Sequence, residues 1–115
     1  MSKAMEEIKV TFGKIIADAR KKAGLSQKDL AAKIKKEDGE QISPQYLNDI
    51  EHDRRNPPSE FLITQFAKEL KLSKEYLILT AGTLPQDIQK KIAVVDPEIV
   101  DEAYKVFRRT IREKE

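Results

Sequence analysis

The sequence lacks several residue types, and each absence excludes a class of function. Its 115 residues include no cysteine and no tryptophan, and they include one histidine, His52. Without cysteine the chain forms neither a disulfide nor a cysteine-ligated metal site, a composition typical of a reducing compartment. A lone histidine supplies neither a histidine-based zinc site nor a catalytic dyad. We therefore expect no metal or other cofactor and a cytoplasmic location.

Long apolar runs and a strong charge of one sign are also missing. No apolar stretch approaches the length of a membrane span, and the first ten residues, MSKAMEEIKV, are too charged for a signal peptide. There is no glycine-rich phosphate loop and no HExxH motif, so we expect no enzyme, and no small-molecule ligand is evident. The 22 basic and 20 acidic residues leave a net charge of +2, so charge alone does not indicate nucleic-acid binding.

The sequence does contain a series of short amphipathic segments, each bounded by helix-capping residues. Apolar residues recur at helical spacing from Ile8 to Ala23. Further helices are predicted after Ser26, from Pro44 to about His52, after Ser59 and after Ser73. No segment alternates as a strand would, so the predicted fold class is all-α. The residues expected to face the core include Phe12, Ile15, Ile16, Ala19, Leu30, Ala31, Ile34, Leu47, Ile50, Phe61, Leu62, Phe66, Ala67 and Leu70.

The chain changes character after Gly82. Residues 8–82 hold the five predicted helices, and residues 83–115 form a helical extension. Within the extension, LPQDIQKKIAVV predicts a short helix, and Asp96-Pro97 begins a longer one over residues 97–113. That helix carries an apolar stripe, which either dimerises or packs on the five-helix unit. The stripe consists of Ile99, Val100, Ala103, Val106, Phe107 and Ile111.

The predicted helix that begins at Pro44 has a composition suited to DNA. Leu47 and Ile50 give it one narrow apolar face, while the rest is polar and includes Gln45 and Asn48. The major groove of B-DNA accepts one α-helix, and glutamine or asparagine can bind adenine there through two hydrogen bonds. The helix that begins at Gln27 would cross the DNA backbone and hold this recognition helix in place.

Three segments together resemble the Cro/C1-type (XRE) helix-turn-helix family of repressors. They are FGKIIADARKKAGLSQKDLAAKI, ISPQYLNDIEHDRRNPPSEFL and FAKELKLSKEYL, and the resemblance covers about residues 8–82. It implies a five-helix, lambda-repressor-like domain that binds double-stranded DNA. The function it implies is transcriptional regulation, as a repressor that binds a palindromic operator as a homodimer.

The resemblance also assigns roles to individual residues. The implied base-contacting residues are Gln45, Tyr46, Asn48 and Asp49. The implied DNA-backbone contacts are Gln27, Lys28, Ser43, His52, Arg54, Arg55 and Asn56. Arg20 and Glu51 match the family's structural ion pair, which ties the first helix to the end of the third.

Several alternatives remain open in the sequence. Gln27 meets a phosphate or braces Gln45, and Asp49 binds cytosine or, as we favour, a group within the protein. The segment KKEDGEQ, residues 35–41, lengthens the family's usually tight turn between the two helices. Its two lysines favour phosphate contacts, and its acidic residues oppose them. A different function is also compatible with the chain: an antitoxin or adaptor whose partner binds residues 97–113.

Overall fold

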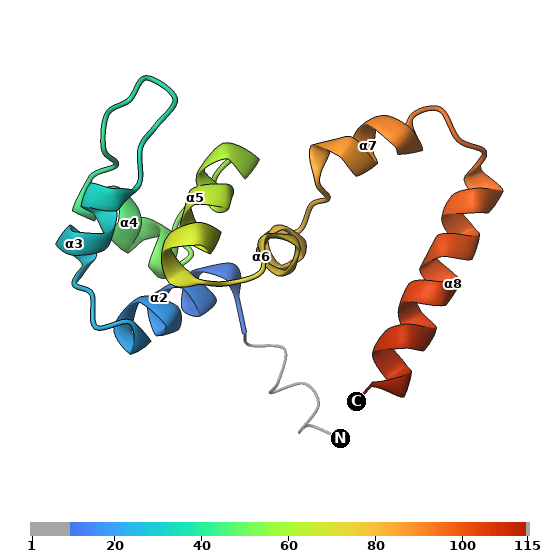
Figure 1. The fold of residues 1–115 in the computed structure, drawn as a ribbon, viewed down its shortest axis with the longest axis horizontal. Helices are drawn as coiled ribbons and strands as arrows, with labels where there is room; N and C mark the ends of the chain where they lie inside the picture. The colour runs from blue at the N-terminus through green and yellow to red at the C-terminus, as the bar shows by residue number, and fades with distance from the viewer. Residues whose placement is uncertain (1–9, 115) are drawn as a thin grey trace. The chain divides into compact units, whose positions relative to one another are not determined.

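The computed structural model describes residues 10–114, which contain seven helices and no strand (Figure 1). The all-α prediction is confirmed. The chain divides after Thr83 into two compact units. The first contains α2 (Phe12–Lys22), α3 (Gln27–Lys33), α4 (Pro44–Glu51), α5 (Glu60–Leu70) and α6 (Lys74–Thr80). The second contains α7 (Gln86–Ile92) and α8 (Pro97–Glu113).

Each helix of the first unit begins at a side chain that caps it. The hydroxyls of Ser26, Ser43, Ser59 and Ser73, all predicted caps or helix starts, accept hydrogen bonds from backbone amides in the first turn. The predicted start of the first helix was wrong. Val10 and Thr11 are not helical, and Thr11 caps α2 instead. Ile8 lies outside the described residues.

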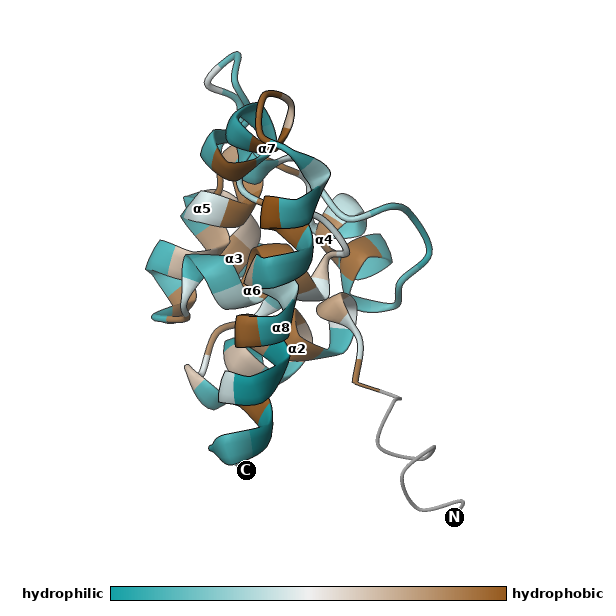
Figure 2. Ribbon diagram, turned by 90° about the vertical axis from the view of Figure 1, so that its right-hand side faces the viewer, coloured by the Kyte–Doolittle hydropathy of each residue, from teal (hydrophilic) through white to brown (hydrophobic). Residues whose placement is uncertain are grey.

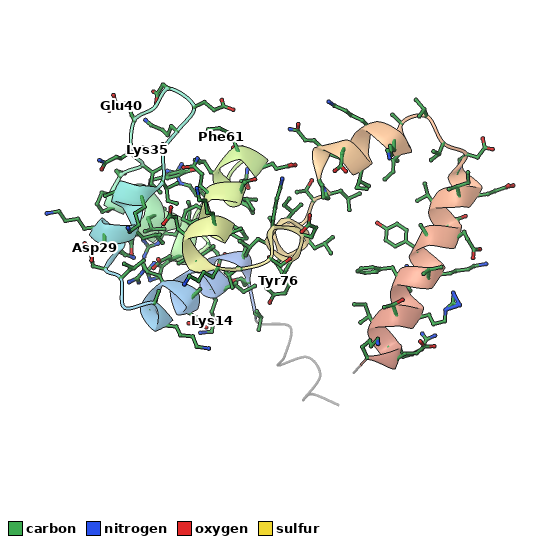
Figure 3. The ribbon with its side chains drawn as sticks, viewed as in Figure 1. Lys14, Asp29, Lys35, Glu40, Phe61 and Tyr76 are labelled. Carbon is green, nitrogen blue, oxygen red and sulfur yellow. The ribbon has the colours of Figure 1, made fainter. Side chains whose placement is uncertain are left out.

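The core of the first unit draws on all five of its helices. The largest fully buried side chains are Ile16, Leu30, Ile34, Leu47, Ile63, Phe66, Leu77 and Ile78. One predicted core residue was wrong, because Phe61, which is labelled in Figure 3, is 45% exposed. Ile63 is buried instead. At 3.6 residues per turn, Phe61 lies nearly opposite the face formed by Leu62, Phe66 and Leu70.

The lengthened turn between α3 and α4 is an ordered hairpin, residues 35–41 (Figure 1). An isolated antiparallel bridge joins Lys35 to Gln41, and the amide of Ile42 donates to the carbonyl of Ile34 over 3.0 Å. Gln65 of α5 holds the hairpin's base by bonding both the amide and the carbonyl of Lys35, at 2.7 and 2.6 Å. Because Ile34 and Ile42 are both buried, the insertion leaves the ends of α3 and α4 anchored in the core.

The start of α2 is packed tightly against the end of α4. A Cβ placed on Gly13 would collide with the carbonyl oxygen of Ile50 and lie 2.8 Å from that of Glu51. Asp53 lies just beyond α4 with φ of 56°, and its carboxylate accepts hydrogen bonds from Thr11 Oγ1 at 2.6 Å and Gly13 N at 3.1 Å. This clamp fixes the C-terminus of α4, and therefore the loop that follows it.

The second unit has no buried residue in either helix. Asp96 occupies the N-cap position of α8 as predicted, but its side chain makes no capping hydrogen bond. Figure 2 shows apolar and polar residues alternating along α8.

None of the helices described between residues 10 and 114 is long and apolar enough to cross a membrane.

Candidate nucleic-acid interface

Helix α4 buries one face and leaves the other accessible. Leu47, Ile50 and Glu51 are buried, Gln45 is exposed, and Asn48 is half-buried. Ser43 caps the helix by accepting a hydrogen bond from the Tyr46 amide at 3.0 Å, and Pro44 follows at the first helical position, where a missing N–H has no cost. The predicted base-contacting residues therefore lie on one short helix and are not among its buried residues, although Tyr46 packs against the core.

Arg20 of α2 and Glu51 of α4 form a bidentate pair beneath this helix. Arg20 Nε and Nη2 donate to the two carboxylate oxygens of Glu51 at 2.6 and 3.0 Å, and Nη1 donates to the carbonyl of Leu25 at 2.8 Å. Both side chains are buried. The hydrogen bond with Glu51 raises the pKa of Arg20, and burial only partly opposes this effect. The guanidinium consequently stays charged and holds α2, α4 and the turn before α3 together.

Gln27, the first residue of α3, is linked to the same network. Its Nε2 donates to Asn48 Oδ1 at 3.0 Å and to Glu51 Oε1 at 2.9 Å. Gln27 therefore braces Asn48 and not Gln45, which was one of the two roles that the sequence left open. This hydrogen bond to Asn48 Oδ1 fixes the orientation of the Asn48 amide, whose Nδ2 donors do not take part in it.

On the exposed side of α4, Asp49 accepts one hydrogen bond and forms two ion pairs. Gln45 Nε2 donates to its Oδ1 at 3.0 Å. Arg54 Nη1 and Arg55 Nη2 each lie 3.5 Å from one of its oxygens. The Arg55 guanidinium also sits over the Tyr46 ring, 4.7 Å from the centroid. Of the two alternatives for Asp49, the structure shows the bond within the protein.

His52 at the end of α4 and the loop that follows carry four of the predicted backbone contacts: His52, Arg54, Arg55 and Asn56. Arg54 N donates to the Asp49 carbonyl at 2.9 Å and Asp53 N to the Ile50 carbonyl at 3.1 Å, which is a Schellman-type helix end. His52 Nδ1 lies 2.9 Å from the carbonyl oxygen of Asn48. Lys28 and Asn56 are exposed.

Four residues that position α4 or the hairpin before it could not be predicted from the sequence, because their partners are far away along the chain. They are Thr11, Gly13, Asp53 and Gln65.

Among residues 10–114, no group of three or more histidine, cysteine, aspartate or glutamate side chains is placed to hold a metal ion. The face around α4 thus offers amides, arginines and helix N-termini. These groups bind phosphates and base edges.

The fold and this face define a DNA-binding helix-turn-helix protein. A helix-turn-helix family model matches residues 16–77, and the chain belongs to this family, the Cro/C1-type (XRE) regulators. A solved structure titled SinR protein/SinI protein complex is 23% identical with a TM-score of 0.50, covering 87% of this chain and 99% of that chain. At this identity the likeness concerns the fold. No curated protein matches the chain.

Proposed function

We propose that this DNA-binding regulator is a sequence-specific repressor that binds a palindromic operator as a homodimer, with α4 in the major groove. The observation that carries the proposal is the preset hydrogen bonding of Gln45 and Asn48. Each amide is already bonded on one side within the protein, to Asp49 and to Gln27. Each therefore meets a base in a fixed orientation, and less side-chain entropy is lost on binding.

The two amides favour different base atoms. Gln45 keeps Oε1 and one N–H after bonding Asp49, the pair that matches N6 and N7 of adenine. Asn48 keeps both of its Nδ2 donors, which match acceptors such as N7 and O6 of guanine. Tyr46 and Asp49 complete the base-facing set. The proposed backbone contacts are Gln27, Lys28, Ser43, His52, Arg54, Arg55 and Asn56. Gln27 would reach the backbone through its main-chain N–H at the start of α3, because its side-chain donors are engaged.

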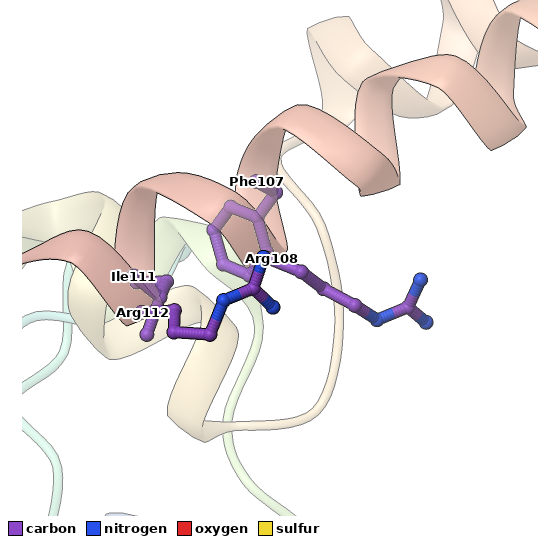
Figure 4. A pocket seen from close by; sticks show the side chains of 4 residues that line it. All are labelled: Phe107, Arg108, Ile111 and Arg112. Carbon is purple, nitrogen blue, oxygen red and sulfur yellow. The ribbon is translucent and has the colours of Figure 1, made fainter.

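The proposed dimer contact is the apolar stripe of α8. Phe107 and Ile111 are 46% and 51% exposed, and with Arg108 and Arg112 they line a shallow hollow on this helix (Figure 4). A second copy of the stripe would remove this apolar surface from water. Two recognition helices would then reach half-sites about one helical turn, or 34–36 Å, apart.

The direct test is selection of bound sequences from randomised duplex DNA, followed by gel shifts with the selected site. A palindromic consensus bound by two chains supports the proposal. Gln45→Ala should lose about 1–3 kcal/mol on that site and relax choice at one position, whereas Arg55→Ala should weaken all sequences alike and flatten the salt slope by about one unit. Retention of no DNA, with co-purification of a protein partner, would instead identify an adaptor. Reduced transcription from a promoter carrying the site would establish repression.

A further inference from the structure

The carboxylate of Asp49 is out of place on a surface that faces a polyanion. Its side chain is 20% exposed, and it lies on the same helix as Gln45 and Asn48. A carboxylate at this position repels phosphate and lowers affinity for every DNA sequence. The structure shows what offsets its charge in the free protein: Arg54 and Arg55, each 3.5 Å away.

The ion pairs of these two arginines with Asp49 are weak enough to be exchanged for contacts with DNA phosphates. Their side chains are 56% and 48% exposed, and ion pairs at such positions contribute little stability. Arg55 has a second contact, the Tyr46 ring, which keeps its guanidinium beside α4. The same two arginines are the strongest candidates for phosphate contacts. Asp49 and the DNA backbone therefore compete for them.

We propose that Asp49 sets the ratio of specific to non-specific DNA binding by this competition; the inference rests on the proposed function. Binding to phosphates alone draws the arginines away and leaves an unpaired carboxylate against the DNA. On the correct site the same cost is offset through Gln45, whose amide stays bonded to Asp49 while its remaining N–H and Oε1 bind a base. Asp49 thus weakens binding to random DNA more than binding to the operator.

Asp49→Asn separates charge from shape, because asparagine keeps an oxygen that can accept the Gln45 hydrogen bond. Asp18→Asn is the matched control. Asp18 is a 59% exposed carboxylate on α2, 3.3 Å from Lys14, so this change also removes one negative charge next to a cation. Affinity of the full chain is measured by fluorescence anisotropy for the selected site and for a scrambled duplex, over a series of salt concentrations.

We expect Asp49→Asn to bind the scrambled duplex about fivefold more tightly and with a steeper salt slope, while affinity for the selected site rises less. The specificity ratio then falls by about threefold or more. Adding Arg54→Ala and Arg55→Ala should abolish the gain on scrambled DNA, because the freed arginines produce it.

Equal gains on both duplexes, as Asp18→Asn would give by bulk charge, overturn the inference and leave the proposed function standing. Loss of affinity for both duplexes also overturns it, because Asp49 would then serve to position α4. Wild-type protein that prefers no sequence removes the proposed function, and this inference with it.

Discussion

Two carboxylates near the end of the recognition helix, those of Glu51 and Asp53, each accept more than one hydrogen bond. Glu51 joins α4 to α2 and α3, and Asp53 joins the loop after α4 to the start of α2. Asp49 instead ties the exposed face of α4 to the arginines of that loop. Removal of the Glu51 or the Asp53 carboxylate leaves more than one donor without its partner. The cost of such a change therefore exceeds that of a single hydrogen bond.

The buried pair is tested by a double-mutant cycle. Arg20→Ala leaves the Glu51 carboxylate buried with only Gln27 as donor, and should lower the free energy of unfolding by about 3–5 kcal/mol. Adding Glu51→Ala should cost much less than the sum of the two single changes, because no buried charge then remains. Urea unfolding measures all three variants. Strictly additive losses would show that the two side chains act independently.

Asp53 combines a strained backbone with two side-chain hydrogen bonds, and two substitutions separate these effects. Asp53→Ala loses both bonds and keeps φ at 56°, whereas Asp53→Gly loses the bonds and relieves the left-handed strain. We expect alanine to be less stable than glycine by about 1 kcal/mol, and both to be less stable than wild type. The denaturant concentrations at the unfolding midpoint of wild type and the two variants give their order of stability. An alanine variant as stable as wild type would show that the clamp contributes nothing.

At the scale of elements, α2 and α4 approach so closely that position 13 in α2 has room for glycine but for no larger residue. Gly13 lies within α2, where alanine would ordinarily favour the helix by about 1 kcal/mol. The carbonyl oxygens at the end of α4 occupy the space a methyl group would need. Local helix propensity and tertiary packing thus act in opposite directions at this position.

Gly13→Ala should therefore destabilise the protein by more than about 2 kcal/mol, despite the gain in helix propensity. Gly24→Ala is a suitable comparison, because nothing lies within 4 Å of its Cβ position and only φ of 75° opposes the change. That variant should lose about 1–2 kcal/mol. Thermal melts followed by circular dichroism rank the two. A Gly13→Ala protein at least as stable as wild type would contradict the close packing described here.

The elements that local signals define could be predicted from the sequence. Serine caps and apolar spacing gave α3 to α6, and Ser43-Pro44 marked the start of α4. Family resemblance pointed to Arg20 and Glu51. Contacts between distant residues left no local signal, so the Asp53 clamp and the bonds of Gln65 to the hairpin were missed. The prediction that Phe61 faces the core was wrong for a different reason. Phe61 is apolar, but its angular position on α5 places it away from the buried face.

At the scale of the whole molecule, a recognition unit with a packed core is joined to a helical unit without one. The first unit buries residues from all five of its helices, whereas α7 and α8 bury none. Isolated helices gain little stability from propensity alone and depend on packing of an apolar face. Under the proposed function, the second copy supplies that packing for α8.

Phe107→Glu tests this role in the full-length chain. A charge in the apolar stripe should convert a dimer into a monomer and weaken operator binding at least tenfold, with the first unit still folded. Lys105→Ala changes the charge by the same amount outside the stripe and should remain dimeric. Light scattering and gel shifts measure both variants. A Phe107→Glu protein that stays dimeric with full affinity would move the interface away from α8.

The hairpin between α3 and α4 offers a position where a fluorescent label can be attached to the protein. The backbone hydrogen bond between Ile34 and Ile42 closes the hairpin outside residues 36–40. The entropic cost of closing a loop grows slowly with its length, by about 0.6 kcal/mol per doubling. Residues 36–40 can therefore be replaced or extended with little loss of stability. Since the sequence has no cysteine, Glu37→Cys would accept a single fluorophore in the hairpin that precedes the recognition helix. Such a label would report DNA binding without altering α3 or α4.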